Sequence, residues 1–217
     1  MRIGILGSGL MGGKLGTLFA RAGHEVVFSY ARSEKKLKKL AREAQGNARA
    51  GTPVEAARDA DALLLAVHWS RVNEVLHQAG DVAGKVIVTC SLPMNDENSG
   101  LVVGLTSSGA ETLAKKIPRA RIVSAFGTVP SEVLFDVYEA RRRKASRPSL
   151  VYCGNQADAK EVAATLIRGV GFDPVDAGPL RVARHIEPFA LLMGQLAYEG
   201  DGGPKIAYRF ERIGKEK

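Results

Sequence analysis

The stretch Arg2-Ile-Gly-Ile-Leu-Gly-Ser-Gly-Leu-Met-Gly12 decides the fold of this chain. Its apolar residues Ile3, Ile5 and Leu6 predict a short, buried strand of a parallel sheet. Three glycines then follow in the pattern G-x-G-x-x-G, and residues 12–22 continue with helical periodicity. A glycine-rich turn between a strand and a helix is the fingerprint of a dinucleotide-binding site, although glycines in this context can also serve packing alone.

Each glycine of the motif has a mechanical role in the dinucleotide interpretation. Gly7 permits the tight turn out of the strand, and Gly9 lets a pyrophosphate approach the backbone. Gly12 lets the helix pack closely against the strand. Free amides at the start of the helix, at Leu10 and Met11, would then face the phosphates. We therefore expect a phosphate-binding loop made of Gly7, Ser8, Gly9, Leu10 and Met11.

The bulk properties are those of a globular protein. The chain has 217 residues, 45% of them hydrophobic, which is enough to bury a full core. No apolar run approaches the roughly 20 residues that cross a bilayer, so we expect no membrane insertion, and Met1 leads straight into the first strand, so we expect no signal peptide. Cys90 and Cys153 lie in apolar segments and are expected to be free, buried thiols, which suits a cytoplasmic location. The four histidines show no metal-ligand spacing with these cysteines, so no metal site is expected.

The net charge is +8, from 31 Lys and Arg against 23 Asp and Glu. Such a charge can reflect nucleic acid, an anionic cofactor or solubility alone. The basic residues concentrate at positions 32–42 and 141–144. In the first run they alternate with Leu37, Leu40 and Ala41, which is typical of a solvated amphipathic helix. Aromatic residues are not interleaved with the basic runs, so no nucleic-acid surface is expected.

The second predicted strand covers residues 24–28. The residues that follow it indicate which dinucleotide binds. In NAD-binding sites an Asp or Glu near the end of this strand holds the ribose hydroxyls. No acid stands at that position here; Arg32, Ser33 and Lys36 follow the strand instead. They can donate charge-assisted hydrogen bonds to a 2′-phosphate, although they also suit the first turn of a surface helix. We expect NADP, bound at this end by Tyr30, Arg32, Ser33 and Lys36.

Three further apolar runs, at residues 61–67, 85–90 and 121–125, predict central strands of the same sheet. In open parallel sheets, ligands lie beyond the carboxyl ends of the strands. The tails of these strands should therefore surround a nicotinamide ring; they contribute Val67, His68, Trp69, Ser91, Pro93, Ala125, Phe126 and Gly127. His68 suits a base or a ribose ligand, and Trp69 a wall of the cleft or the core. No convincing acid–base constellation is present, so we assign no catalytic residue.

Strands and helices alternate along the chain, which is typical of a doubly wound, mostly parallel α/β sheet of the Rossmann type. From residue 179 the pattern changes to a long apolar helix over residues 180–198 and a short helix over 205–210. We therefore predict a dinucleotide-binding domain at residues 1–178 and a small helical cap at 179–217. The cap is more apolar than a free surface helix requires, which favours a homodimer.

With these segments in place, the chain resembles the coenzyme F420-dependent NADP reductases and, more widely, the cytosolic reductase domains of transmembrane metalloreductases. The resemblance rests on the glycine motif, on Ser91-Leu-Pro93, on Ser124-Ala-Phe-Gly-Thr-Val-Pro130, and above all on Asp176-Ala-Gly-Pro-Leu180 followed by Ala183-Arg184 and Glu187-Pro188. It implies NADP binding, hydride transfer to a flavin-like ring and a homo-oligomer. Deazaflavin-using members carry a histidine where Gly127 stands here, which leaves flavin or another small acceptor open.

The expected function is that of an NADPH-dependent oxidoreductase. It would pass a hydride between NADP(H) and a flavin or deazaflavin (coenzyme F420-like) acceptor, with no side chain carrying a proton. Arg184 is expected to hold an anionic group of that acceptor. Two alternatives stay open: a reductase of a small hydroxy acid or imine, which would need an acid or base such as His68, and a non-enzymatic regulator that senses NADP.

Overall fold

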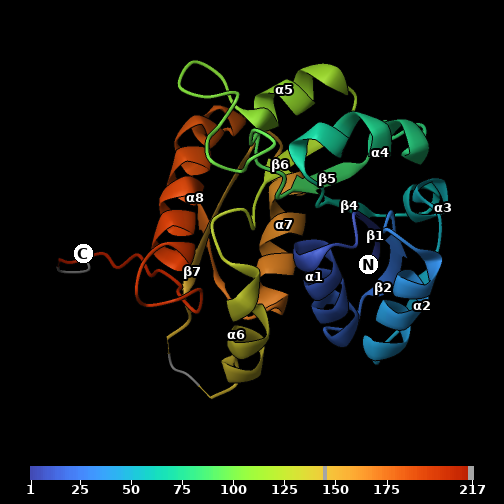
Figure 1. The fold of residues 1–217 in the computed structure, drawn as a ribbon, viewed down its shortest axis with the longest axis horizontal. Coiled ribbons are helices and arrows are strands. Elements are labelled where there is room, and N and C mark those ends of the chain that lie inside the picture. The colour runs from blue at the N-terminus through green and yellow to red at the C-terminus, as the bar shows by residue number, and fades with distance from the viewer. Residues whose placement is uncertain (144–145, 215–217) are drawn as a thin grey trace.

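The computed structural model describes residues 1–143 and 146–214. Lys144, at the end of the second basic run, and residues 215–217 of the predicted cap lie outside this description. The described residues form one sheet of eight strands, in the order β3-β2-β1-β4-β5-β6-β7-β8 (Figure 1). The strands are β1 (Arg2–Leu6), β2 (Glu25–Ser29), β3 (Ala48–Ala50), β4 (Ala62–Leu65), β5 (Val86–Thr89), β6 (Arg121–Ser124), β7 (Ser149–Gly154) and β8 (Asp173–Asp176). Neighbouring strands are parallel except β6 and β7, which are antiparallel.

Helices connect the strands, and some of them begin at a side-chain cap. Ser33 caps one helix by accepting a hydrogen bond from Lys36 N, and Thr52 and Glu55 form a capping box ahead of another. The α-helices are α1 (Leu10–Arg21), α2 (Glu34–Glu43), α3 (Pro53–Arg58), α4 (Val72–Ala79), α5 (Gly109–Lys116), α6 (Leu134–Ala140), α7 (Ala157–Gly169) and α8 (Ala183–Tyr198). Short 3₁₀ turns occur at η1 (Trp69–Arg71), η2 (Ser131–Val133) and η3 (Leu180–Val182).

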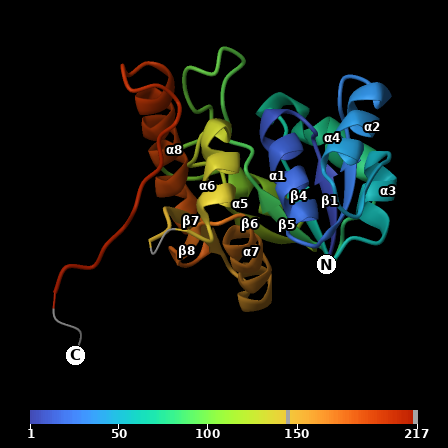
Figure 2. The same ribbon diagram turned by 90° about the horizontal axis from the view of Figure 1, so that it is seen from below.

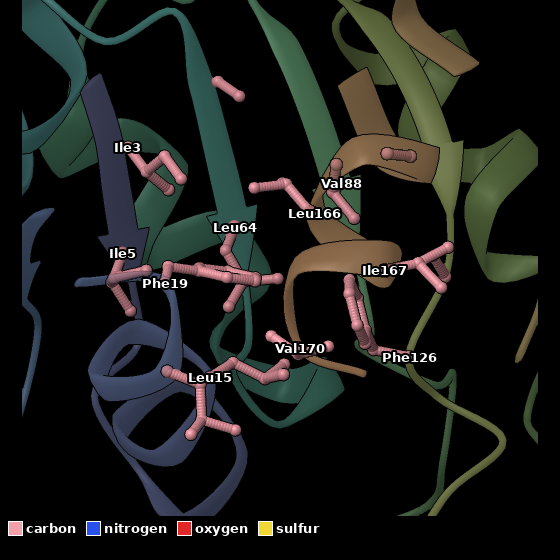
Figure 3. Packing of buried hydrophobic residues seen from close by; sticks show 14 of the residues in the cluster. Ile3, Ile5, Leu15, Phe19, Leu64, Val88, Phe126, Leu166, Ile167 and Val170 are labelled. Carbon is pink, nitrogen blue, oxygen red and sulfur yellow. The ribbon is translucent and has the colours of Figure 1, made fainter. Parts of the chain in front are cut away.

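The sheet is covered on both faces, and each face has its own buried cluster. One cluster, part of which Figure 3 shows, joins Ile3 and Ile5 of β1 to side chains of α1, α6 and α7. The other joins Leu6 of β1 to side chains of α3, α4, α5 and α8. Successive strand residues point to opposite faces, which is why β1 serves both clusters. Each fully buried Leu or Ile contributes about 1.5–3 kcal/mol relative to an exposed one. The prediction of a doubly wound α/β sheet is confirmed.

The long apolar helix predicted after residue 179 is present as η3 and α8, which lies beside β7 (Figure 1). Its residues Leu180, Ala183 and Ile186 are buried in the same cluster as residues of β4 and α5. The helical cap is therefore built onto the sheet domain. The boundary between residues 178 and 179 stays a prediction.

The short helix predicted at residues 205–210 is wrong. This segment is extended, and Tyr208 O accepts a hydrogen bond of 2.8 Å from Ser149 N at the start of β7. The Tyr208 ring packs edge-on to Phe189 of α8 and to Phe210, with centroids 5.0 and 5.3 Å away. An extended chain puts Tyr208 and Phe210 on one side, whereas a helix would separate them. After Phe210 the chain runs away from the body (Figure 2).

Cys90 and Cys153 are free thiols, as expected. Burial raises the pKa of both to about 12. Within the described residues, no helix is long and apolar enough to cross a membrane.

Candidate functional site

The turn from β1 into α1 has the geometry that the glycine pattern predicts. Gly7 has a φ of +113°, which L side chains rarely adopt. A Cβ on Gly12 would lie 1.9 Å from Gly7 O, so only glycine lets the helix approach the turn. Around the position of a Gly9 Cβ there is open space within 4 Å. The three glycines thus make the turn, leave room for a ligand and close the helix onto the strand.

Ser8 anchors this turn from the inside. Its side chain is fully buried, and its hydroxyl donates to Ser29 O at 2.8 Å. Its backbone N–H donates to Tyr30 O at 3.0 Å. Both donors of Ser8 are therefore used within the protein. The first amides of α1, at Leu10 and Met11, precede the first intrahelical bond, which runs from Gly13 N to Gly9 O, and remain to face a ligand.

A groove of about 840 Å³, here called the β2 groove, lies beside the end of β2. Tyr30, Arg32, the start of α3 and the start of α4 line it. Tyr30 has a φ of +54°. Burial, and then the hydrogen-bonded carboxylate of Glu74, raise the pKa of its phenol. Arg71, which pairs with Glu74 at 2.9 Å, also lines this groove and was not singled out in the sequence.

The other two residues predicted to bind the 2′-phosphate lie differently. Ser33 is the N-cap of α2, where its hydroxyl accepts a hydrogen bond from Lys36 N. Lys36 lines a second groove, of about 550 Å³, between α1 and α2, where Gly9 is also found. The structure therefore places Arg32 and Lys36 on two grooves, with the start of α2 between them.

Ser91 and Pro93, both predicted to surround the nicotinamide, face inward. The Ser91 hydroxyl donates to Val67 O at 2.7 Å and accepts from Val67 N at 3.2 Å, so it ties the tails of β4 and β5 together. Pro93 is buried against Gly109 of α5. Leu92 and Met94 point the other way and line a cavity. The alternation of an extended segment is the signal that could have identified them.

His68 holds a loop. Its Nδ1 lies 3.0 Å from Ser70 Oγ and its Nε2 lies 3.1 Å from Asn98 Oδ1. Because an amide oxygen only accepts, Nε2 carries the proton and Nδ1 accepts from Ser70. Both ring nitrogens are thus used. Trp69 is half-buried against the cluster beneath α4 and α5, in agreement with the core interpretation.

The tail of β6 differs from the expectation at Phe126. Its ring is fully buried and packs edge-on to Phe19, with centroids 6.0 Å apart (Figure 3). A φ of +68° at Phe126 turns the side chain into the core. The side chain of Phe126 therefore lies in the core, which leaves only its backbone to border the cleft, and Ala125 is buried as well. Gly127 does line the cavity, and a Cβ there would lie 3.3 Å from Leu92 Cδ2.

This cavity, here called the α8 cavity, has a volume of about 800 Å³. It lies between the start of α1, the tails of β5 and β6, and the second half of α8. Its walls are mostly apolar, and the α8 residues that line it were not singled out in the sequence. Among its lining residues are Leu10, Met11, Leu92, Met94, Gly127, Ser131, Leu191, Met193 and Tyr198.

The residues of the most specific sequence motif hold α8 in place. Glu187 is 2% exposed, and its carboxylate accepts from Gly109 N at 2.9 Å and Ala110 N at 3.0 Å, which caps α5. Arg184 forms a bidentate pair with Glu111, at 2.8 and 2.7 Å. Arg184 is therefore paired with a carboxylate and is not among the residues that line the α8 cavity, contrary to the expectation. The motif positions the wall of the α8 cavity.

Known proteins resemble this chain in sequence. The family described as NADP oxidoreductase, coenzyme F420-dependent, matches residues 2–93. Metalloreductase STEAP3 of Rattus norvegicus is 30% identical over 190 residues, which are 88% of this chain and 36% of that protein. The chain thus spans about a third of the length of this curated relative.

Solved structures share the fold. A candidate F420-dependent NADP reductase from Arthrobacter sp. FB24 superposes with a TM-score of 0.84 at 22% identity, covering 98% of this chain and all of that one. A reductive aminase from Aspergillus terreus, solved with NADPH and ethyl-5-oxohexanoate, has a TM-score of 0.64 at 19% identity, covering 89% of this chain and 61% of that one. The match over residues 2–93 confirms the resemblance to the coenzyme F420-dependent NADP oxidoreductases that was seen in the sequence.

Proposed function

We propose that the chain passes a hydride between NADP(H) and a flavin or a deazaflavin of the coenzyme F420 type. The open space at Gly9 and the free amides of α1 fit the pyrophosphate, and the β2 groove offers Arg32 for the 2′-phosphate. NADPH bound to neighbours of the same fold supports this cofactor.

The observation that carries the proposal is the α8 cavity, which adjoins the phosphate-binding turn at Leu10 and Met11. Its volume and apolar walls suit a planar ring system, and Gly127 leaves one side free of a side chain. The cofactor supplies the hydride, and the chain binds, orients and excludes water.

The alternative of a dehydrogenase that uses His68 as its base has less support, because both ring nitrogens of His68 are bonded within the protein. A regulator that senses NADP would need no acceptor cavity. Turnover of NADPH separates the enzyme from such a regulator.

We also propose a homodimer in the cytoplasm. Leu192 and Leu196 lie one turn apart on α8 and are 53% and 46% exposed. Such an apolar patch favours a second copy of the chain. The free thiols of Cys90 and Cys153 support a reducing compartment.

The function is tested by anaerobic stopped-flow mixing of NADPH and protein with FMN, FAD or a deazaflavin, followed at the nicotinamide absorbance. We expect oxidation of NADPH with at least one of these rings. If none is reduced while a ketone or an imine is, the acceptor class is wrong. If NADPH binds and no acceptor is reduced, the regulator is the correct interpretation.

A further inference from the structure

A chain of hydrogen-bonded polar side chains borders the α8 cavity at its η2 end. Lys14 Nζ of α1 donates to Ser131 Oγ at 3.1 Å and to Ser131 O at 3.0 Å. Ser131 Oγ donates to Glu132 Oε2 at 3.3 Å, and Tyr198 OH donates to the same oxygen at 3.0 Å. Ser131 and Tyr198 line the cavity. The chain thus links α1, η2 and α8 at one end of a space whose walls are mostly apolar.

Lys14 is an unusual member of this chain. It stands in the second turn of α1. Its bonds within the described residues go to two neutral oxygens of Ser131. It also lines the groove that contains Gly9, so its ammonium lies between the phosphate-binding turn and the α8 cavity. Because both of its partners are neutral, this cation can also act on a ligand.

Ser131 is well placed to pass a proton from this cation. It is buried at the base of η2, yet it belongs to the cavity wall. A hydroxyl donates one proton and accepts two, so Ser131 can accept from Lys14 while it donates to a group in the cavity. The donation to Glu132 is long, at 3.3 Å, and is the bond that a bound acceptor would replace.

We propose that Ser131 is the proton donor to the hydride acceptor and that Lys14 reprotonates Ser131. This proposal rests on the proposed function. The hydride pair moves from nicotinamide C4 to N5 of a flavin or C5 of a deazaflavin. Negative charge develops on the ring at N1, and N1 then takes the hydroxyl proton of Ser131. The oxygen of Ser131 takes a proton from the Lys14 ammonium, and water returns one to the amine. This replaces the expectation that no side chain carries a proton.

Two planar tricyclic acceptors separate proton donation from positioning. Lumiflavin or a 5-deazaflavin, whichever the wild-type protein reduces faster, takes a hydride and a proton. The 10-methylacridinium cation takes a hydride alone and becomes neutral. Ser131→Ala removes the hydroxyl but keeps the bond from Lys14 to the backbone carbonyl, so the contact between α1 and η2 survives. Lys14→Met removes the proton source, and Lys14→Arg keeps the charge but does not release a proton near neutral pH. Lys115→Met, exposed on α5, controls for lost charge.

We expect Ser131→Ala, Lys14→Met and Lys14→Arg each to slow reduction of the flavin or deazaflavin by about 100-fold or more. Reduction of 10-methylacridinium and the Kd of NADPH should change less than about threefold in all three. Lys115→Met should match the wild type with both acceptors.

Five results would overturn the proposal. Equal losses with both acceptors in Ser131→Ala make Ser131 a positioning residue, and no loss with either acceptor removes it from the reaction. Full rescue by Lys14→Arg means that charge alone matters. A large loss of NADPH affinity in Lys14→Met makes Lys14 a phosphate ligand. If the wild-type protein reduces none of these rings, the proposed function fails first, and the proton donor fails with it.

Discussion

At Gly127 the size of a side chain should decide whether an acceptor fits. A Cβ there would already lie 3.3 Å from Leu92, so the branches of a larger side chain have only the α8 cavity to enter. We predict that Gly127→Leu lowers acceptor turnover about tenfold or more, or about 1.4 kcal/mol in the barrier. The Kd of NADPH should stay within about twofold, measured by quenching of intrinsic fluorescence.

Gly127→Ala is the matched control and should retain most of the turnover, because it adds only the Cβ. Loss of NADPH binding in Gly127→Leu, or unchanged turnover, would place the ring site elsewhere.

Arg32 is the residue on which the choice of NADPH over NADH should depend. It is exposed, lines the β2 groove and follows a strand end without an acidic residue. We predict that Arg32→Ala weakens NADPH binding by about 1.5–3 kcal/mol, the range for hydrogen bonds to charged groups, and leaves NADH binding unchanged. Titration of both nucleotides measures this. Arg42→Ala, exposed on α2, should change neither. Equal losses for both nucleotides would show that Arg32 does not contact the 2′-phosphate.

At the scale of elements, α5 depends on a carboxylate from α8. Glu187 accepts from the N–H groups of Gly109 and Ala110, which no residue of α5 itself can satisfy. We predict that Glu187→Gln lowers the free energy of unfolding by about 1–3 kcal/mol, because the amide group leaves one N–H without an acceptor. Urea titration followed by circular dichroism measures it. Glu199→Gln, exposed at the end of α8, should be neutral, and an equal loss there would argue against the cap.

The same carboxylate gives a pH dependence with a definite sign. Burial raises the pKa of Glu187 above its ordinary value of 4.5, despite the two N–H donors. The folded state then binds more protons than the unfolded state, so this group's contribution to stability falls as pH rises from about 4.5 to the raised pKa. We predict that the stability difference between wild type and Glu187→Gln shrinks over this window. Urea titrations at several pH values test it, and a difference that grows with pH would contradict the assignment.

At the scale of the whole molecule, we expect α8 to form the interface of a dimer. Its exposed Leu192 and Leu196 should be covered in a dimer. We predict that light scattering at micromolar concentration gives the mass of two chains, and that Leu192→Lys with Leu196→Lys gives one. Val102→Lys is the control, because Val102 is a 57% exposed apolar residue on the loop between β5 and α5. If the wild type is a monomer, or if the variant with both lysines is still a dimer, this surface is not the dimer interface.

Much of the architecture followed from local patterns. Apolar runs predicted the central strands, and the glycine spacing predicted the turn at Gly7 and the close approach at Gly12. These features depend on neighbours a few residues away, through backbone conformation and periodicity. The family resemblance came from the same short segments.

Tertiary packing decided which residues of each strand tail reach the cavity. Phe126 turns into the core, Ser91 binds the neighbouring tail, and Leu92 faces the cavity instead. Two features could not be predicted from local pattern: which side chains of α8 face the cavity, and the pairing of Lys14 with Ser131, 117 positions apart. Side-chain direction at a strand end depends on what lies across from it, and that is set only when distant segments pack together.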